Sequence, residues 1–392
     1  MESCARPAIA EGKAKVSQPK DHTLRSRISV FIVIVQSVLL LIHWFLYDTW
    51  ISFRAQPDPP GITGWQIGLA ALSVSFIAAS LLAFRSSNLF ARIFYRIAAA
   101  WLGTVNFLFL AACLCWIIYL AARLGGFQID RSAWAGAMLG LAVLASLYGI
   151  LNARWLRIRR ITVNLSNLPA SWRGRVAALV SDVHLGHVNG LGFMRRIVAH
   201  LARLKPDIVF ITGDLYDGTK VDAALLAEPW KDCSAPWGAY FITGNHEEFR
   251  DRSAYLDAVR DAGVRVLQNE KVVVDGLQVV GVHFRESANL TQFRSILRNA
   301  GIEKESASIL LSHSPHALPV AEEAGLSLQL SGHTHGGQIF PFTWFTHRIF
   351  GAYTYGLQRF GEMLVYTTTG AGTWGPPMRV GTHPEIVLIE FA

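Results

Sequence analysis

Five short polar motifs in the second half of the chain combine residue types that bind metal ions. They are Ser-Asp182-Val-His184, Gly213-Asp214-Leu-Tyr-Asp217, Gly244-Asn245-His246-Glu247, Ser312-His313-Ser-Pro and Gly332-His333-Thr-His335-Gly336. Four of them directly follow an apolar, β-prone run, so a buried strand would deliver each one to the carboxyl edge of a sheet, where α/β proteins hold their sites. Oxygen and imidazole ligands without cysteine suit Mn, Fe, Zn or Ni. The pattern predicts a hydrolase with two metal ions.

Each motif taken alone could be an ordinary turn, because Asp, Asn and Gly are common turn residues. The pair His333 and His335 is harder to explain in this way, since residues at i and i+2 of an extended segment point to the same side. Five such motifs in this order are harder still to explain as five independent turns. We therefore treat them as parts of one site.

The residues of the motifs and their order along the chain resemble those of the calcineurin-like metallophosphoesterase family, over roughly residues 155 to 392. Within it, the nearest likeness is to bacterial membrane-associated phosphodiesterases of the UDP-diacylglucosamine hydrolase type. The closing stretch Thr-Thr-Gly-Ala-Gly-Thr-Trp-Gly, followed by Pro-Pro-Met-Arg-Val-Gly, also resembles the end of that subgroup's domain. The resemblance implies an α/β domain in which two sheets form a sandwich flanked by helices, with the metals where strand ends meet.

The resemblance also implies a role for the individual motif residues. Seven positions match metal ligands: Asp182, His184 and His335 for the first metal, Asn245, His313 and His333 for the second, and Asp214 as the carboxylate that bridges both. His246 matches the unliganded histidine that contacts the phosphoryl oxygen or protonates the leaving group. At Glu247 the chain departs from the many members that carry Asp there, and the longer side chain could change the orientation of His246.

The chemistry of phosphate esters calls for these residue types independently. A phosphodiester is anionic, and its transition state spreads charge over the equatorial oxygens. Two divalent ions about 3.5–4 Å apart would neutralise that charge and provide a bridging hydroxide as the nucleophile, and manganese is the favoured ion. His246 could give a proton to the departing oxygen at neutral pH. Asp217 is interpreted as a turn residue or a neighbour of the ligands rather than a ligand.

The first 150 residues have a different composition. Four apolar runs of about 19–26 residues contain no Asp, Glu, Lys or Arg, and each could cross a hydrocarbon core of roughly 30 Å as a helix. The runs are Ile28–Tyr47, Trp65–Phe84, Ile97–Ala122 and Ala133–Leu151. The alternative is that these runs are buried helices of a soluble bundle, but it requires four uncharged runs of this length in one chain. We expect a multi-pass membrane domain of four helices.

Basic residues near the ends of these runs predict the orientation in the membrane. Thirteen lie in the three segments that would share one side: Arg6, Lys13, Lys15, Lys20, Arg25, Arg27, Arg85, Arg92, Arg96, Arg154, Arg157, Arg159 and Arg160. Only three lie in the opposite loops: Arg54, Arg123 and Arg131. We expect a protein of the cell (inner) membrane with both termini and the catalytic domain in the cytoplasm.

These observations divide the chain into four parts. They are a polar cytoplasmic tail at 1–27, expected to be disordered, a membrane domain at 28–151, a linker with a first strand at 152–175, and the metallophosphoesterase domain at 176–392. Strands are expected at 176–181, 207–212, 239–243, 264–267, 271–275, 277–282, 308–312, 327–331, 363–368 and 385–390. Helices are expected at about 190–204, 220–228, 252–262, 290–300 and 316–324.

Three residues are candidate contacts for the substrate. His187 lies close to His184 but, as a loop residue, is expected to be exposed; Glu247 adjoins His246; and Trp344 lies in an aromatic segment between His335 and Glu362. This segment either packs into the core or meets the bilayer interface or a lipid chain, since aromatic rings favour that zone.

We expect a membrane-embedded dinuclear phosphoesterase that hydrolyses a phosphodiester or pyrophosphate bond, with the bilayer and a phosphorylated, lipid-linked substrate as partners. One alternative is a soluble, nucleotide-like substrate with the helices as an anchor, and another is a membrane sensor with secondary catalysis. An apolar groove from the metals to the membrane would favour the lipid-linked substrate over both alternatives. The net charge of +8 resides largely near the membrane, so nucleic acid is not an expected partner.

Overall fold

The computed structural model describes residues 21–54 and 64–392, so most of the predicted tail lies outside the described residues. Within these ranges, four helices are long and apolar enough to cross a membrane: α1 (Asp21–Phe53), α2 (Gly64–Ala83), α3 (Leu89–Leu124) and α4 (Arg131–Arg154). Side chains such as Phe31 and Ile117 are more than 60% exposed in the protein alone, as expected of surfaces that lipid covers. The prediction of four apolar helices is confirmed.

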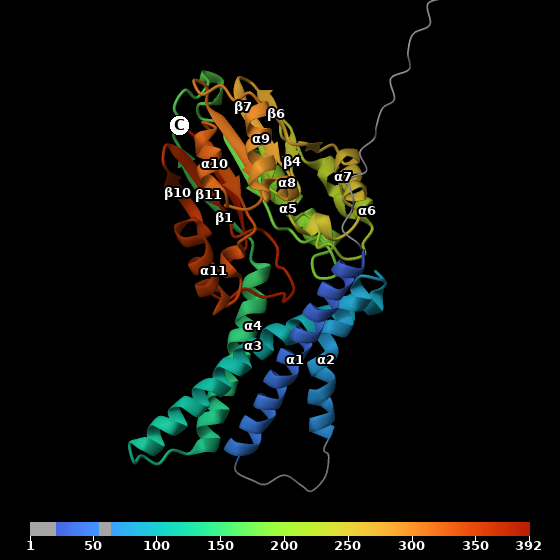
Figure 1. Cartoon of the computed structure of the whole chain (residues 1–392), viewed down its shortest axis with the longest axis vertical. Helices are drawn as coiled ribbons and strands as arrows, with labels where there is room; N and C mark the ends of the chain where they lie inside the picture. The colour runs from blue at the N-terminus through green and yellow to red at the C-terminus, as the bar shows by residue number, and fades with distance from the viewer. Residues whose placement is uncertain (1–20, 55–63) are drawn as a thin grey trace, which may run out of the picture.

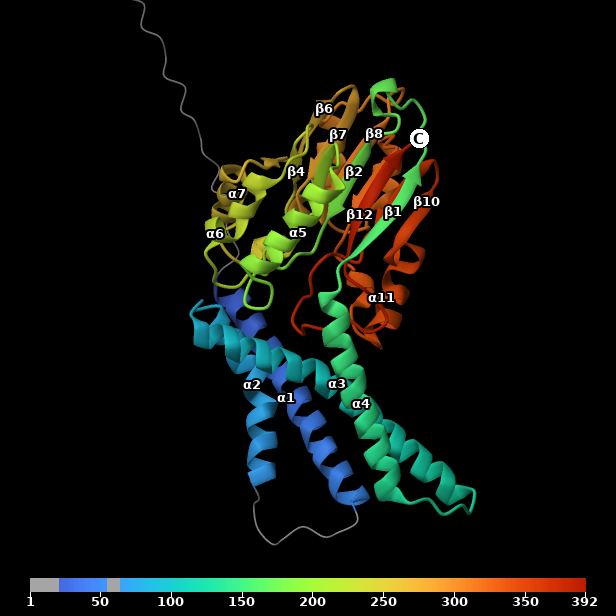
Figure 2. The same cartoon turned by 180° about the vertical axis from the view of Figure 1, so that it is seen from behind.

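The helices form two antiparallel pairs, α1 with α2 and α3 with α4, which diverge on the side away from the C-terminal domain (Figures 1 and 2). Polar caps fix two of the turns between them. Asn88 accepts a hydrogen bond from the amide of Ala91 at the start of α3, and Asp130 accepts from the amides of Ser132 and Ala133 at the start of α4. One side of the helices faces the C-terminal domain (Figure 1). On it lie the start of α1, the α2–α3 turn and the end of α4.

Residues 157–392, all of which are described, form two six-stranded mixed sheets. The first has the order β1 (Arg157–Val163), β12 (Glu385–Phe391), β2 (Val176–Val180), β3 (Ile208–Ile211), β4 (Ala239–Phe241), β5 (Arg265–Val266). The second has the order β10 (Gly356–Phe360), β11 (Met363–Thr367), β9 (Leu328–Ser331), β8 (Ser308–Ser312), β7 (Leu277–Val282), β6 (Glu270–Val274). Strands β2 to β5 run parallel to one another, and so do β7, β8, β9 and β11.

Helices cover the outer faces of both sheets, giving the sandwich that the family resemblance implied (Figures 1 and 2). The helices of these faces are α5 (Leu191–Leu204), α6 (Ala223–Ala227), α7 (Arg252–Asp261), α8 (Phe284–Ser287), α9 (Leu290–Asn299) and α10 (Leu318–Glu323). Helix α11 (Phe342–Phe350) lies instead at one end of the domain. Side chains of one strand alternate between layers: Ala177 and Leu179 face the second sheet, whereas Ala178 and Val180 face α5. Both faces of these strands are buried, which explains their continuous apolar sequence.

Two helices and one strand of the C-terminal domain, α8, α11 and β10, were not predicted. Helix α11 and strand β10 both fall within the aromatic segment, where closely spaced rings give no clear period for a helix or a strand. None of the side chains of α11 is buried, whereas Tyr353 and Phe360, later in the same aromatic segment, pack against a core cluster. The alternative of a core-packing segment therefore applies to the second half of the segment and not to α11. Helix α11 lies at the end of the domain that faces the membrane helices (Figure 2).

The C-terminal domain is held directly against the membrane helices. Only two residues separate α4 from β1. The fully buried Met378, in the loop before β12, lies so close to Gly103 of α3 that a Cβ atom on Gly103 would be 2.5 Å from its sulfur. Asn106 of α3 donates to the carbonyl of Phe340. The two parts therefore share a packed interface beyond the covalent connection.

This interface predicts the effect of Gly103→Leu. The added side chain would collide with Met378 and Pro376, and overpacking of this kind costs about 1–3 kcal/mol. We expect a lower thermal unfolding midpoint in detergent or nanodiscs. Gly140→Leu on α4 is the matched control, because a Cβ atom there meets nothing within 4 Å. Equal midpoints for the two variants would show that the interface is not closely packed at Gly103.

Candidate metal centre

The five motifs meet at one edge of the sandwich, where the carboxyl ends of strands from both sheets converge. Asp182, Asp214 and Asn245 follow β2, β3 and β4 of the first sheet. His313 follows β8 and His333 follows β9 of the second sheet. Residues that are up to about 150 positions apart in the chain thus become neighbours, as the strand-end argument expected.

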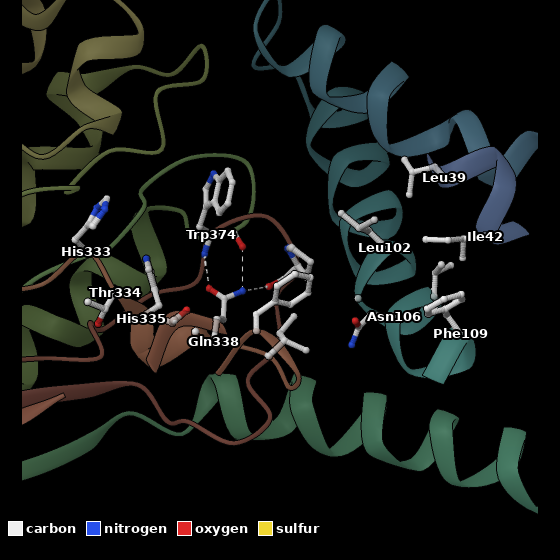
Figure 3. A pocket seen from close by; sticks show the side chains of 17 residues that line it. Leu39, Ile42, Leu102, Asn106, Phe109, His333, Thr334, His335, Gln338 and Trp374 are labelled. Atoms are coloured by element: carbon white, nitrogen blue, oxygen red, sulfur yellow. Dashed lines mark hydrogen bonds between the residues drawn. The ribbon is translucent and has the colours of Figure 1, made fainter. Parts of the chain in front are cut away.

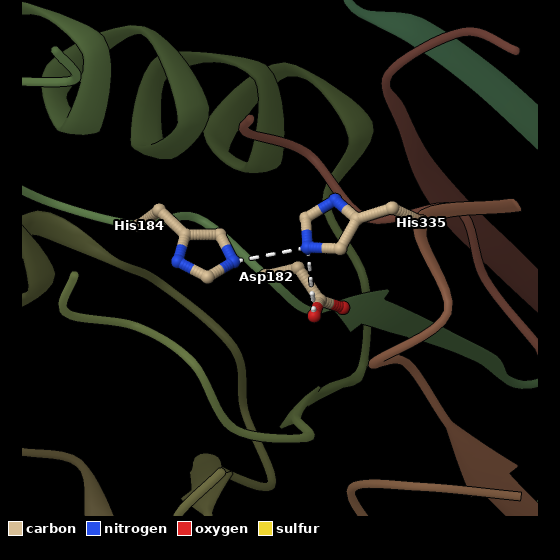
Figure 4. Close-up of side chains that lie close together, drawn as sticks. All are labelled: Asp182, His184 and His335. Atoms are coloured by element: carbon tan, nitrogen blue, oxygen red, sulfur yellow. Dashed lines mark hydrogen bonds and ion pairs between the residues drawn. The ribbon is translucent and has the colours of Figure 1, made fainter. Parts of the chain in front are cut away.

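The first cluster contains Asp182, His184 and His335 (Figure 4). The Nε2 atoms of the two histidines are 3.0 Å apart, and His335 Nε2 is 3.5 Å from Asp182 Oδ1. Asp214 Oδ2 lies 3.8 Å from His184 Nε2, so it borders this cluster as well. All four residues are less than 9% exposed.

The second cluster contains His313, His333 and Asn245, with Asp214 on its other side. His313 Nε2 is 3.2 Å from Asp214 Oδ2 and 3.1 Å from Asn245 Oδ1. His333 Nδ1 is 3.0 Å from Asn245 Oδ1 and 3.2 Å from His313 Nε2. The same oxygen of Asp214 therefore faces both clusters, the position that a bridging carboxylate needs.

The donor atoms fit divalent cations. Ligands about 2.0–2.2 Å from one ion are roughly 3 Å from each other, which matches the spacing in both clusters. Burial, reinforced by the charge of His313, lowers the pKa of His333 to about 3, and burial lowers that of His335 as well. Both are neutral imidazoles, the form that binds metal.

The charges around Asp214 and His313 also favour a cation at the centre. Burial alone would lower the pKa of His313, but the carboxylates of Asp214 and Asp182 raise it to about 9. Burial alone would raise the pKa of Asp214, but His313 and His246 hold it well below its usual range. The pocket thus keeps a buried carboxylate ionised and stabilises a cation beside it.

The backbone at the clusters is unusual. Five of the seven predicted ligands have positive φ angles, between 49° and 70°: Asp182, His184, Asp214, His333 and His335. This left-handed conformation costs non-glycine residues about 1–3 kcal/mol and persists only where the surroundings impose it, commonly at functional sites. Here it turns side chains at the strand ends toward one another.

His246 lies beside both clusters, and together with His184 and Asp217 it forms a further group of side chains that could hold a metal ion. Its amide donates to Asp214 Oδ1, and its Nδ1 is 3.1 Å from the carbonyl of Asp217. With the proton on Nδ1 shared with that carbonyl, Nε2 faces the centre, 4.0 Å from Asp214 Oδ2. The ring packs against Phe249 and Trp374. Burial lowers its pKa below the usual value.

Two acidic residues support the clusters. Asp217 Oδ1 is 3.5 Å from His184 Nδ1, so it can orient this imidazole. Glu247 is fully buried and accepts hydrogen bonds from the backbone amides of Asp214, Tyr216 and Gly244. The candidate role of Glu247 as a substrate contact is wrong, because both of its oxygens hold the loops that carry the ligands.

The other two candidate substrate contacts have different outcomes. His187 is 2% exposed, and its ring contacts Thr219 Oγ1 and the carbonyl of Ser86 in the α2–α3 turn. The expectation of an exposed loop residue near the substrate is wrong, since this side chain joins the domain to the membrane helices. Trp344 is 54% exposed on α11, and its contact with a substrate stays a prediction.

Arg379 was not assigned a role from the sequence, although it lies in the closing motif. It is fully buried, and its guanidinium lies 3.2 Å from His335 Nδ1 while donating to the carbonyls of Thr369 and Gly372. An arginine in a Pro-rich loop is ordinarily exposed, so composition gives no signal for this role. Only the fold brings it to the first cluster.

A cavity of about 520 Å³ connects the centre with the membrane helices (Figure 3). On one side it is lined by His333 and His335, and on the other by apolar side chains of α1 and α3, among them Ile42, Leu102 and Phe109. The loop side chains Gln338 and Trp374 lie between them (Figure 3). The cavity is therefore an apolar passage from the clusters to helices that lipid would surround.

Comparison with known proteins supports this assignment of the site. A sequence model of calcineurin-like phosphoesterases matches residues 176–337. A transmembrane protein with metallophosphoesterase domain from Danio rerio is 29% identical over 390 residues, covering 92% of this chain and 88% of that protein. An uncharacterized metallophosphoesterase from Aquifex aeolicus is 31% identical over 258 residues, covering 64% of this chain and 97% of that protein. The first match extends into the helical region, so the four helices belong to a membrane protein.

The tight approach of the loops predicts the effect of Gly244→Ala. A Cβ atom at this position would be 2.1 Å from Asp214 Oδ1, so the shared carboxylate must move. We expect Mn²⁺ binding to weaken at least tenfold, measured by calorimetric titration of the purified protein. Gly192→Ala in α5 is the control, because a Cβ atom there meets nothing within 4 Å. Unchanged affinity in Gly244→Ala would contradict the assignment of Asp214 to the metals.

Proposed function

Because the chain belongs to the calcineurin-like metallophosphoesterase family, whose members are metal-dependent phosphoric ester hydrolases, we propose that it cleaves a phosphodiester or pyrophosphate bond in a lipid-linked substrate. Asp182, His184 and His335 would hold one divalent ion, and Asn245, His313 and His333 the other. Asp214 would contact both. Manganese is our proposed ion, since the donors are oxygens and imidazoles without thiolate.

The observation that carries the lipid-linked substrate is the cavity between the clusters and helices α1 and α3. Its membrane side is lined mainly by apolar side chains such as Ile42, Leu102 and Phe109, which offer no hydrogen bonds to a nucleoside or sugar. The polar Asn106 also lines this side, and its Nδ2 donates to the carbonyl of Phe340. An acyl chain in this passage would gain about 0.8 kcal/mol for each methylene removed from water. The phosphoryl group would then lie at His333 and His335, where the passage ends.

Two divalent ions, when bound, would supply Lewis-acid neutralisation of the charge on the phosphoryl group. The remaining chemistry falls to this chain's own residues. Asp214 keeps Oδ2 directed at both clusters because Oδ1 accepts a hydrogen bond from the amide of His246. In its doubly protonated form, His246 would donate the Nε2 proton to the departing oxygen, while its Nδ1 proton stays with the carbonyl of Asp217. Glu247 and Asp217 hold these groups in place.

We also propose that the C-terminal domain faces the cytoplasm. The described basic residues Arg92, Arg96 and Arg154 lie at the ends of α3 and α4 next to the domain, whereas Arg123 and Arg131 lie at the far ends (Figure 1). The excess of basic residues on the domain side supports this orientation. The exposed rings of α11, among them Trp344 and Phe345, would meet the headgroup region of the same leaflet.

The alternatives have less support. A soluble, nucleotide-like substrate calls for a polar mouth, but the passage beside the clusters is mainly apolar. A sensor calls for a polar pocket among the helices. A groove between α1 and α2 contains His43 and Ser73, but their polar atoms bond to neighbouring groups of the membrane domain.

Turnover of two diesters tests the proposal. With Mn²⁺ added, the wild type should hydrolyse water-soluble bis-p-nitrophenyl phosphate, and Asp214→Asn and His246→Ala should each lose activity by about 10²-fold or more. Leu102→Trp narrows the passage far from the ligands. We expect it to lower turnover of a diacyl phosphodiester in nanodiscs at least tenfold, while turnover of the soluble diester stays within twofold.

Leu144→Trp is the matched control for Leu102→Trp, because Leu144 of α4 is 62% exposed and does not line the passage. Wild-type turnover of the diacyl substrate in Leu102→Trp would contradict a lipid chain in the passage. Unchanged hydrolysis of the soluble diester in Asp214→Asn would contradict catalysis at this centre.

A further inference from the structure

The loop that carries Arg379 is attached to membrane helix α4 through its backbone. The amide of Arg379 donates to the carbonyl of Gly149 at 2.9 Å. Asn152, which is 5% exposed, donates from Nδ2 to the carbonyls of Arg379 and Thr382, at 2.9 and 2.8 Å. Helix α4 thus contacts both the amide and the carbonyl of Arg379, which fixes the place of this residue.

A glycine permits this close contact. A Cβ atom on Gly149 would be 2.8 Å from a side-chain carbon of Val380 and 3.1 Å from Met378 Cβ. Any larger residue would therefore push the loop away from the helix. The last turns of α4 and residues 378–382 are packed as one unit.

From this fixed backbone the side chain of Arg379 extends to the first cluster. Its guanidinium donates to the carbonyls of His335, Thr369 and Gly372, at 2.6 to 3.2 Å, and lies 3.2 Å from His335 Nδ1. A fully buried guanidinium is stable only where several acceptors surround it, so its position is closely determined. The backbone and the ring of His335 are held by the same group.

The opposite side of the first cluster is attached to the membrane domain independently. Arg96 of α3 donates to the carbonyls of His187 and Val188, at 2.8 and 2.9 Å. These residues belong to the loop that begins with the predicted ligands Asp182 and His184. The loop of Asp182 and His184 is therefore held by α3 directly, and the loop of His335 is connected to α4 through the side chain of Arg379.

We propose that Arg379 is a positioning residue through which helix α4 holds His335, so that packing of the membrane helices sets the cation affinity of the first cluster. The inference rests on the proposed function, in which His335 is a metal ligand. Loosening α4 from the loop weakens cation binding at Asp182, His184 and His335 while the second cluster keeps its affinity. The membrane domain is in this respect a part of the centre as well as an anchor.

Mn²⁺ titration of the full chain in nanodiscs tests this inference. Two backgrounds separate the clusters: His333→Ala leaves only the first intact, and His184→Ala leaves only the second. Asn152→Ala removes both hydrogen bonds to the loop without touching a predicted ligand. We expect it to weaken Mn²⁺ binding at least tenfold in the His333→Ala background and less than twofold in the His184→Ala background.

Gly149→Ala is a second variant, because it displaces the same loop by steric contact and should show the same selective loss. Ser146→Ala is the control, since the buried hydroxyl of Ser146 donates to the carbonyl of Ala142 within α4 and bonds to no other described residue. Equal affinities, or an equal loss at both clusters in Asn152→Ala and Gly149→Ala, would overturn the inference. A wild type that binds fewer than two Mn²⁺ ions would instead overturn the proposed function.

Discussion

Two carboxylates buried together, Asp182 and Asp214, are the constraint on which the rest of the centre depends. Removing an ion from water costs several kcal/mol even after the protein relaxes, and two like charges side by side raise that cost. The surroundings offset it with histidines and backbone amides, and they leave donor atoms about 3 Å apart that suit divalent cations. The left-handed ligand residues and the glycines packed against the carboxylates follow from the same requirement, because the loops must approach one another closely.

The two-sheet architecture lets the ligand loops approach one another closely, because it brings together strand ends from distant parts of the chain. The membrane helices cover one side of the resulting centre. Met378 packs against Gly103, and Asn152 holds the loop of Arg379. The same approach of α1 and α3 leaves the apolar passage to His333 and His335. The position of the centre and the proposed route of a lipid-linked substrate therefore have one structural origin, the packed interface between the two domains.

Much of this arrangement could be predicted from the sequence. The apolar runs predict the four helices because length and lack of charge are sufficient signals, and the motifs after strands predict which side chains converge. Contacts made only by the fold were not predictable. His187 was expected to be exposed, but the α2–α3 turn covers it. Glu247 binds three amides that lie at Asp214, Tyr216 and Gly244, and Arg379 reaches His335 across 44 positions. No local sequence pattern indicates contacts between residues that lie so far apart in the chain. Helix α11 was missed because its aromatic residues have no clear period.

The most direct test of the central claim is an anomalous difference map at the manganese edge, from crystals of the full chain grown with Mn²⁺. Two peaks about 3.5–4 Å apart are expected, as in other two-metal sites. One should contact Asp182, His184 and His335, the other should contact Asn245, His313 and His333, and both should contact Asp214. A single peak, peaks elsewhere, or an Asp214 carboxylate that contacts neither ion would contradict a dinuclear centre built on this residue.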